Sequence, residues 1–160
     1  MAKKAKSSGG ASDYKIGPLS ATDLDPVIAI DKSHSGASRN GFFERRLTAA
    51  QKDPTEFVYV GARHGDVLVG FALARLVEGE FGGEAPVASL DSFGVDPDHQ
   101  HHGVGQLLLN EIDSVLTHKG VVELTTELRW SDQALIQFLS QSGFSMAPRV
   151  VLSRDTDSGE

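Results

Sequence analysis

The chain has 160 residues, of which 39% are hydrophobic and 23% are charged, and this balance fits one soluble globular domain. Its 15 lysine and arginine residues against 22 aspartate and glutamate residues give a formal net charge of −7, which argues against nucleic acid or an anionic membrane as the main partner. The absence of cysteine excludes disulfides, thiolate zinc sites and thiol catalysis. No run approaches the ~20 apolar residues of a membrane-spanning helix, and the first ten residues lack the apolar centre of a secretion signal. We therefore expect a soluble, cytoplasmic protein.

Both ends of the chain are polar. Residues 1–13 contain three lysines and a Ser-Ser-Gly-Gly run, and residues 155–160 are equally polar. Such segments bury too little apolar surface to offset the entropy of ordering them. We expect two flexible tails around a single domain over residues 14–154.

Two helices are expected before the first long strands. Residues 20–31 predict a helix because capping residues and acids stand at its start and an apolar stripe follows. A Ser-Gly-rich loop over residues 33–41 interrupts the pattern, and residues 42–52 predict a second amphipathic helix.

A hairpin is the clearest strand signal. Residues 57–62 and 67–77 are rich in β-branched and aromatic residues, and the short polar segment between them predicts an antiparallel pair. The glycine-rich residues 78–86 predict a flexible connection. Residues 87–95 predict a further strand, which the following Asp-Pro must end.

The second half of the chain alternates helices and strands. Residues 103–118 carry an apolar stripe at helical spacing, and residues 121–128 predict a strand. A short helix capped by Ser131-Asp132 closes at Gly143-Phe144, and residues 150–153 offer one last strand. Helices around a hairpin-connected sheet predict a mixed α/β layer structure.

The segment before the long helix predicts an anion-binding loop. Gly103 and Gly105 let a phosphate approach the backbone, and uncapped amides from about His101 to Gln106 lie near the positive end of the helix dipole. Glycines at a helix start also serve simple turns and close packing, so their spacing alone leaves both interpretations open. A P-loop is excluded because no Lys-Ser/Thr follows, and a dinucleotide fingerprint because Leu108 stands where its third glycine belongs.

The residues before the two glycines extend the pattern of the anion-binding loop. Val95, Pro97, Gln100, Gly103 and Gly105 follow a predicted strand with fixed spacing, and this run resembles the acetyl-CoA motif of the GNAT N-acetyltransferase superfamily. The resemblance extends over most of the expected domain. It implies an α/β (α+β) fold with a mostly antiparallel central sheet of about six strands and about four helices. It also implies transfer of an acetyl group from acetyl-CoA to a primary amine by direct attack.

The resemblance assigns cofactor contacts residue by residue. Backbone amides from Gln100 to Gln106 would hold the CoA diphosphate, and the backbone from Phe93 to Val95 would pair with the pantetheine arm. The family's strands part beside the thioester, so a bulge is expected around Gly94. The expected cofactor-binding residues are Phe93, Gly94, Val95, Gln100, His101, His102, Gly103, Val104, Gly105, Gln106 and Asp132, the last of which replaces a family asparagine and also suits a helix cap.

Two carboxylates are candidates for the base that must take a proton from the attacking amine. The Glu-Leu-Arg-Trp-Ser-Asp run from Glu127 resembles the Glu-x-Arg-x-Ser-Asn segment of ribosomal-protein N-terminal acetyltransferases, where the glutamate is the base. Asp91 is the second candidate, because other branches carry the base on that strand, although Ser89 stands at the position of the histone-acetylating branch's glutamate. An ordinary surface or ion-paired role stays open for both.

The resemblance carries over no side chain as the proton donor for the leaving thiolate. Many family members have a tyrosine where this chain has Leu139, and the two tyrosines of the chain, Tyr14 and Tyr59, both suit strands. The remaining candidates are water, Ser131, Ser140 and His34.

Three histidines of the loop, His99, His101 and His102, invite a metal interpretation through their spacing. No carboxylate-rich motif accompanies them, so no metal is expected.

Two other classes of function stay open. One is a non-catalytic acyl-CoA-binding or sensing domain, and the other is an interaction module whose glycine loop is only structural. For an enzyme, the acceptor is expected to be a small amine or a protein N-terminus, and the acidic charge favours a cationic one. A homodimer is expected from the family resemblance alone.

Overall fold

The structure is a computed structural model that describes residues 13–77 and 85–156. The expected tails lie outside these residues apart from Asp13, Asp155 and Thr156, and so does most of the connection predicted over residues 78–86. The chain divides into two compact units. Unit 1 ends at Glu127 and carries the sheet, and unit 2 begins at Leu128 and carries the last helix.

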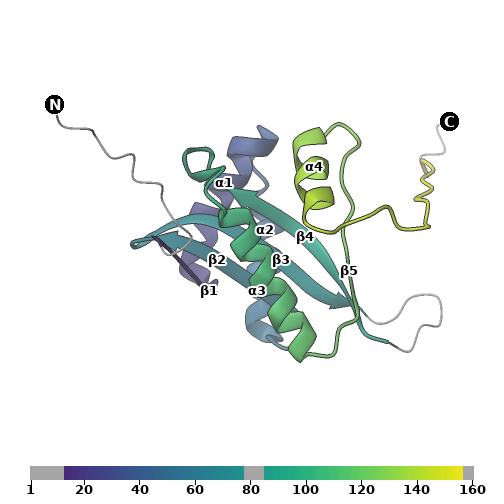
Figure 1. Ribbon diagram of the computed structural model, residues 1–160, viewed down its shortest axis with the longest axis horizontal. Helices are drawn as coiled ribbons and strands as arrows, with labels where there is room; N and C mark the ends of the chain where they lie inside the picture. The colour runs from purple at the N-terminus through teal and green to yellow at the C-terminus, as the bar shows by residue number, and fades with distance from the viewer. Residues whose placement is uncertain (1–12, 78–84, 157–160) are drawn as a thin grey trace. The chain divides into compact units, whose positions relative to one another are not determined.

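Unit 1 contains one five-stranded sheet in the order β1-β2-β3-β4-β5 (Figure 1). The pairs from β1 to β4 are antiparallel, whereas β5 lies parallel to β4. A mixed fold with a mostly antiparallel sheet is therefore confirmed. The strands are β1 (Tyr14–Pro18), β2 (Phe57–His64), β3 (Val67–Val77), β4 (Val87–Val95) and β5 (Glu123–Thr125).

The helices follow the predicted order with shifted ends. The first predicted helix begins with a short 3₁₀ turn and continues past residue 31 to Ser35, where Gly36 adopts φ 71° and closes it. The helical elements are η2 (Ala21–Asp23), α1 (Leu24–Ser35), α2 (Asn40–Lys52), η4 (Pro97–His99), α3 (Val104–His118) and, in unit 2, α4 (Gln133–Gln141).

Two strand predictions need correction. The strand expected over residues 121–128 is only the three residues of β5, because the chain leaves the ladder after Thr125. The strand expected over residues 150–153 is irregular, and Val150, Val151 and Leu152 are 84%, 74% and 88% exposed. Three apolar residues in a row form a strand only where a neighbouring strand accepts their hydrogen bonds, and the sheet of the described residues has five strands rather than six.

The two faces of the sheet are covered by different helices. A Cβ atom at Gly70 would lie 3.1 Å from Val104 and Leu108 of α3, whereas a Cβ atom at Gly94 would lie 3.2 Å from Ile30 of α1. Gly70 and the partner of Gly94, Phe71, are successive residues of β3, whose side chains point to opposite faces. Helix α3 therefore crosses one face, as Figure 1 shows, and α1 and α2 cover the other.

The main apolar core lies between the sheet and helices α1 and α2. Its largest fully buried members include Phe43 of α2 and Phe71 of β3, whose rings meet edge to face with centroids 5.8 Å apart. Edge-to-face contact and full burial fix the distance between α2 and the sheet.

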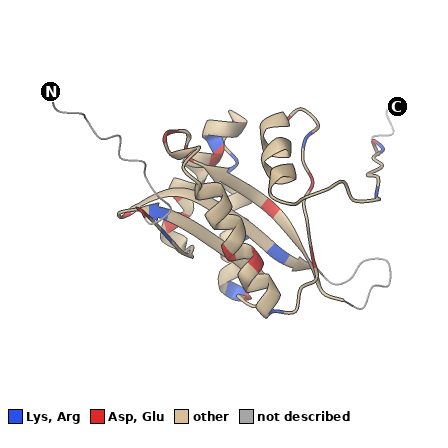
Figure 2. Ribbon diagram, viewed as in Figure 1, with Lys and Arg blue, Asp and Glu red and all other residues tan. Residues whose placement is uncertain are grey.

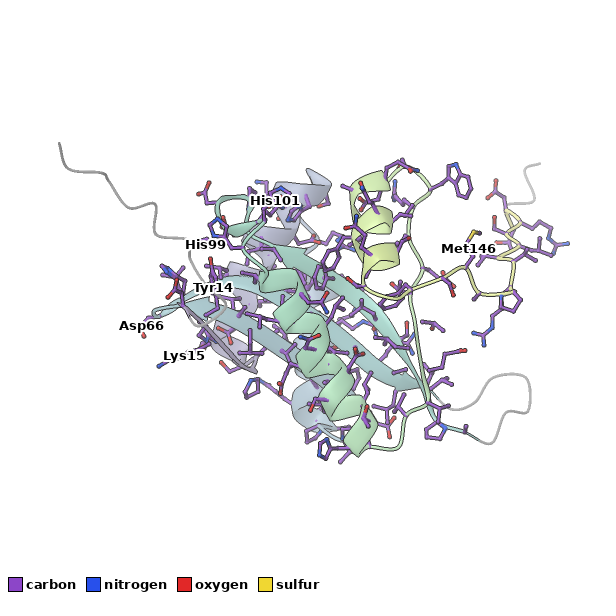
Figure 3. The ribbon with its side chains drawn as sticks, in the orientation of Figure 1. Tyr14, Lys15, Asp66, His99, His101 and Met146 are labelled. Carbon is purple, nitrogen blue, oxygen red and sulfur yellow. The ribbon has the colours of Figure 1, made fainter. Side chains whose placement is uncertain are left out.

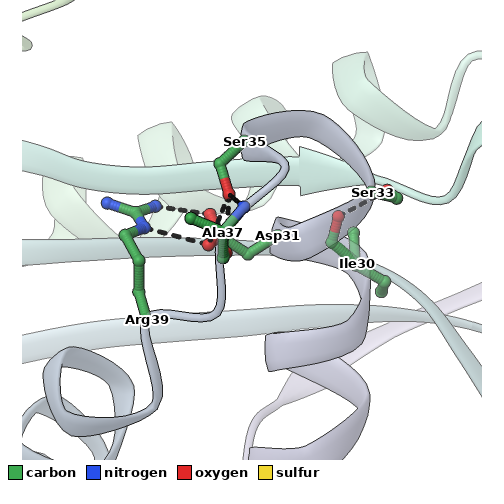
Figure 4. A network of polar contacts seen from close by, with 6 residues as sticks. All are labelled: Ile30, Asp31, Ser33, Ser35, Ala37 and Arg39. Carbon is green, nitrogen blue, oxygen red and sulfur yellow. Dashed lines mark hydrogen bonds and ion pairs between the residues drawn. The ribbon is translucent and has the colours of Figure 1, made fainter.

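A buried carboxylate ties α1 to α2. Asp31 near the end of α1 is 6% exposed and accepts hydrogen bonds from the Arg39 guanidinium and from the Ser35 hydroxyl (Figure 4). The hydrogen bond to Asp31 raises the pKa of Arg39. The Ser-Gly-rich loop between the two helices is thus anchored by an ion pair.

Lysine and arginine residues and aspartate and glutamate residues are scattered over the sheet and helices of unit 1 (Figure 2). Among these residues, none of the helices is long and apolar enough to cross a membrane.

Candidate active site

The N-terminus of α3 has the geometry of an anion cradle. Gly103 is its N-cap residue at φ 83°, and no side chain caps the helix there. A Cβ atom at Gly103 would meet nothing within 4 Å, so the backbone conformation, and not close packing, requires glycine. The first-turn amides of an uncapped helix are donors for an anion at the positive end of the dipole.

The loop before the cradle is held in a defined shape. Asp96 accepts a hydrogen bond of 2.9 Å from the Asp98 amide and caps η4, in which Pro97 is the first residue. His101 has φ 63°, a left-handed conformation that costs energy for a residue with a side chain. The two left-handed residues, His101 and Gly103, turn the chain from η4 into α3.

The carbonyl group of Val95 is a second anchor of this loop. The Asp96 amide donates to Val69 of β3 at 2.7 Å, so the Val95 carbonyl in the same peptide plane points away from β3. It accepts hydrogen bonds from His34 Nε2 at 2.6 Å and from Gln100 Nε2 at 3.3 Å. Because a carbonyl can only accept, Nε2 of His34 carries a hydrogen. His34 entered the sequence analysis only as a proton source, and this contact with the end of β4 was missed.

Strands β4 and β5 part beyond a short ladder. Their pairing runs from Val87–Glu123 to Ser89–Thr125, while β4 continues to Val95. The Thr126 hydroxyl donates a hydrogen bond of 2.9 Å to the Leu90 carbonyl just beyond the last pair. From this point to the end of β4 is roughly 15–20 Å at 3.3 Å per residue. An extended arm fits along such an edge.

The bulge of β4 lies at Asp91 and not at Gly94. Leu73 is paired with Ser92 and Ala74 with Leu90, so Asp91 is the extra residue. Gly94 has a packing reason instead, because its Cβ atom would lie 3.0 Å from the Phe71 ring. The prediction of a bulge was right for the strand and wrong for the residue.

Asp91 is enclosed in an ion-pair network. Its side chain is 8% exposed and accepts from Nε of Arg75 at 3.0 and 3.2 Å and from the Ser89 hydroxyl at 3.1 Å. Arg46 of α2 lies 3.6 Å away. Two guanidinium groups compensate the charge of this buried carboxylate.

Glu127 is in a different environment. It is exposed and directly follows Thr126, whose hydroxyl marks the point where β4 and β5 part. Both carboxylate candidates thus lie within two residues of the Leu90–Thr126 contact, one buried and ion-paired and the other exposed.

Residues 27–144 match the acetyltransferase (GNAT) family, which is most of the chain. The chain belongs to this family. It is an N-acetyltransferase with acetyl-CoA as its co-substrate, as the GNAT resemblance of the loop implied.

Two curated relatives and a solved structure show how far the likeness reaches. The chain is 35% identical over 82 residues, 51% of both chains, to a [ribosomal protein bS18]-alanine N-acetyltransferase of Salmonella typhimurium. It is 27% identical over 132 residues to the enzyme of the same name from Escherichia coli K12, and the match covers 82% of this chain and 81% of the relative. An aminoglycoside N-acetyltransferase in complex with CoA has TM-score 0.74 at 19% identity and covers 89% of this chain and 95% of that chain, which shows a shared fold.

Other expected site residues of this GNAT enzyme have structural partners. Asp132, in unit 2, accepts a hydrogen bond of 3.3 Å from the Leu135 amide and caps α4. Leu139 is 2% exposed and belongs to the apolar face of that helix. Burial raises the pKa of Tyr59 to about 12, although the positive charge of the nearby Arg46 lowers it. The phenol of Tyr59 is therefore a poor proton donor.

Two of the three loop histidines form hydrogen bonds with a tyrosine. His99 and His102 each bond the Tyr14 hydroxyl through Nδ1 at 3.1 Å. Among residues 13–77 and 85–156, no three histidine, aspartate or glutamate side chains gather in a way that could hold a metal ion. Tyr14 was not expected near the loop, because 85 residues separate it from His99.

Proposed function

We propose that this GNAT enzyme acetylates the α-amine at the N-terminus of a protein, with Glu127 as the general base. The observation that carries the proposal is the position of Glu127, exposed and one residue beyond the Thr126–Leu90 contact at which β4 and β5 part. The Glu-Leu-Arg-Trp-Ser-Asp run and the names of the two curated relatives support the same acceptor class.

The proposed cofactor contacts use backbone groups. The first-turn amides of α3, with Gly103 at φ 83°, would hold the diphosphate of acetyl-CoA. The edge of β4 from the bulge to Val95 would pair with the pantetheine arm, which brings the thioester to the point where the strands part. The uncapped helix and the part of β4 beyond its ladder with β5 fit a diphosphate followed by an extended amide-containing arm.

The proposed reaction moves two protons and one acetyl group. The acceptor ammonium gives one proton to the Glu127 carboxylate, and the resulting amine nitrogen attacks the thioester carbonyl carbon. The new C–N bond forms as the C–S bond breaks, and the tetrahedral nitrogen loses a second proton to water. The CoA thiolate takes a proton from water, and Glu127 releases its proton to solvent, so the balanced products are the amide, free CoA and one proton.

Asp91 has a supporting role in this proposal. It neutralises part of the charge of Arg46 and Arg75 and so keeps two guanidinium groups beside the bulge of β4. A carboxylate held by two guanidinium groups and the Ser89 hydroxyl is less accessible to an incoming amine than an exposed carboxylate is. The proposal therefore assigns the base to Glu127 and the positioning of the bulge to Asp91.

The acceptor is tested by a comparison of three amines. A peptide with a free N-terminal alanine, the same peptide with a blocked N-terminus and an internal lysine, and an aminoglycoside are each incubated with acetyl-CoA. Released CoA thiol can be followed directly, because the protein has no cysteine to react with the thiol reagent. The proposal expects turnover on the free N-terminus alone, and turnover only on the aminoglycoside would contradict it.

The base is tested by Glu127→Gln with Glu56→Gln as the matched control. Glu56 is an exposed glutamate before β2, outside the site. Loss of a general base costs about 100-fold or more in kcat, whereas the control keeps the parent value. Acetyl-CoA binding without turnover on any of these amines would instead favour a non-catalytic acyl-CoA-binding or sensing domain.

We place the enzyme in the cytoplasm, a proposal supported by its acidic, cysteine-free composition.

A further inference from the structure

Tyr14 lies at one edge of the sheet and touches the loop that begins 85 residues later. It is the first residue of β1 and is 8% exposed. Its hydroxyl lies 3.1 Å from Nδ1 of His99 and 3.1 Å from Nδ1 of His102. Figure 3 shows Tyr14 and His99 side by side, with His101 on the same loop.

The ring of Tyr14 is held in place by the neighbouring strand. Tyr14 is paired with His64 across β1 and β2, and the two ring centroids are 5.5 Å apart. The His99 ring lies 5.8 Å from Tyr14 and 5.2 Å from His64. The sheet edge therefore presents the hydroxyl to the loop on a rigid support.

The two histidines that Tyr14 binds flank the strained part of the loop. His101, at φ 63°, lies between them, and Gly103, at φ 83°, follows directly. A left-handed residue with a side chain costs about 1 kcal/mol or more and persists where its surroundings determine it. Hydrogen bonds on both sides of His101 supply that constraint, and the direction of the first amides of α3 depends on it.

The hydrogen-bonding capacity of the phenol matches its two partners. A tyrosine hydroxyl has one hydrogen to donate and lone pairs to accept with, so it can donate to one Nδ1 and accept from the other. The arrangement requires one of the two Nδ1 atoms to carry a hydrogen and the other to accept one. Phenylalanine at this position keeps the ring but loses both hydrogen bonds.

We infer that Tyr14 is a positioning residue for the diphosphate of acetyl-CoA, acting through His99 and His102 on the loop that precedes the cradle. The inference rests on the proposed cofactor cradle at Gly103. Tyr14 touches neither the reacting atoms nor the acceptor in this account. Its removal therefore weakens binding of ligands that carry the diphosphate and spares the chemical step.

The test compares two acetyl donors in Tyr14→Phe. Acetyl-CoA carries the diphosphate, and S-acetylpantetheine carries only the arm and the thioester. We expect KM for acetyl-CoA to rise about fivefold to tenfold, the effect of losing two neutral hydrogen bonds, with kcat unchanged. Turnover of S-acetylpantetheine is expected to match that of the parent. The matched control is Tyr59→Phe, because Tyr59 is the second tyrosine of the chain and its buried hydroxyl has no partner among the described residues.

A double-mutant cycle separates positioning from general loss of stability. In Tyr14→Phe, His99→Gln and the combined variant, the effects on KM for acetyl-CoA are expected to be less than additive, since all remove the same bridge. Thermal unfolding of each variant identifies any that no longer fold. If Tyr14→Phe does not fold, the double-mutant cycle is built instead from His99→Gln, His102→Gln and their combination.

The outcomes distinguish this inference from the proposed function. An unchanged KM for acetyl-CoA in Tyr14→Phe, or an equal loss with S-acetylpantetheine, overturns the positioning role while leaving the enzyme intact. Failure of the parent protein to discriminate between acetyl-CoA and S-acetylpantetheine overturns the cradle itself, and the inference falls with it.

Discussion

The Thr126 hydroxyl donates a 2.9 Å hydrogen bond to the Leu90 carbonyl one residue beyond the last β4–β5 pair. This side-chain bond continues the connection between the strands after the ladder has ended. It also fixes the backbone immediately before Glu127. The separation of the strands and the position of the proposed base are therefore set by the same contact.

Replacement of Thr126 by valine tests this contact. Valine keeps the β-branched shape but leaves the Leu90 carbonyl without its donor, which costs about 1 kcal/mol of stability. We expect kcat to fall severalfold because Glu127 loses its fixed backbone. Thr125→Val is the control, since Thr125 bonds the Ala88 carbonyl at a longer 3.3 Å within the ladder. Steady-state kinetics of the two variants decide the point, and equal effects would count against a special role of Thr126.

Asp91→Asn is expected to affect mainly stability, whereas Glu127→Gln is expected to affect mainly catalysis. The substitution leaves Arg75 and Arg46 without their buried partner and is expected to lower the free energy of unfolding by about 1–3 kcal/mol. We expect kcat to fall far less in Asp91→Asn than in Glu127→Gln, where loss of the base costs about 100-fold or more. Denaturant unfolding and steady-state kinetics check both halves, and a larger loss of kcat in the Asp91 variant would move the base to β4.

Gly94→Ala measures the packing between β4 and the helical layer. The added methyl group would lie 3.0 Å from Phe71 and 3.2 Å from Ile30, which forces the core to shift and costs about 1–3 kcal/mol. Gly17→Ala is the matched control, because a Cβ atom there meets nothing within 4 Å. A thermal unfolding curve for each is sufficient, and equal midpoints would contradict the packing explanation for Gly94.

The Asp23–Arg63 pair predicts a pH-dependent part of the stability. Asp23 is 4% exposed, and both its oxygens lie 2.7 Å from Arg63. Burial alone would raise the pKa of Asp23, but hydrogen bonds from Arg63 and the Ser20 amide outweigh burial and lower it below 3.8. A lowered folded pKa stabilises the protein above the unfolded value, and the gain is lost as pH falls through the folded one.

Urea unfolding of the parent and of Asp23→Asn tests this sign. At about pH 7 the variant is expected to be less stable by about 1–3 kcal/mol. At about pH 3 the difference is expected to shrink as the parent carboxylate becomes protonated. A difference that grows in acid would show that the pKa of Asp23 is raised instead.

The sequence predicted the elements whose limits are marked locally. The bounds of β4 are as predicted because Pro97 stops the strand, and α3 begins where its glycines allow a left-handed turn. The run from Val95 to Gly105 carries its information in neighbouring residues, so the proposed cradle could be inferred from the sequence.

The relations that depend on register were not predictable in this way. Asp91 meets Arg75 because the register of β3 and β4 places Arg75 opposite Ser89, two residues before Asp91 on the same face of the sheet, and the sequence of neither strand states that register. The Tyr14 contacts with His99 and His102 join segments 85 and 88 residues apart, and no local pattern encodes such a pair. The missing strand at residues 150–153 shows the converse, because a local apolar run does not supply a partner strand.

The central claim is that acetyl-CoA binds at the N-terminus of α3, and calorimetric titration of Gly103→Glu and Gly120→Glu tests it most directly. Both glycines have positive φ, 83° and 77°, and open space around their Cβ positions, so the two substitutions impose similar strain at opposite ends of α3. The parent and Gly120→Glu are expected to bind acetyl-CoA alike, and Gly103→Glu is expected to lose binding because its side chain places a negative charge in the cradle. Binding by Gly103→Glu at the parent affinity, or no binding by the parent, would contradict the account.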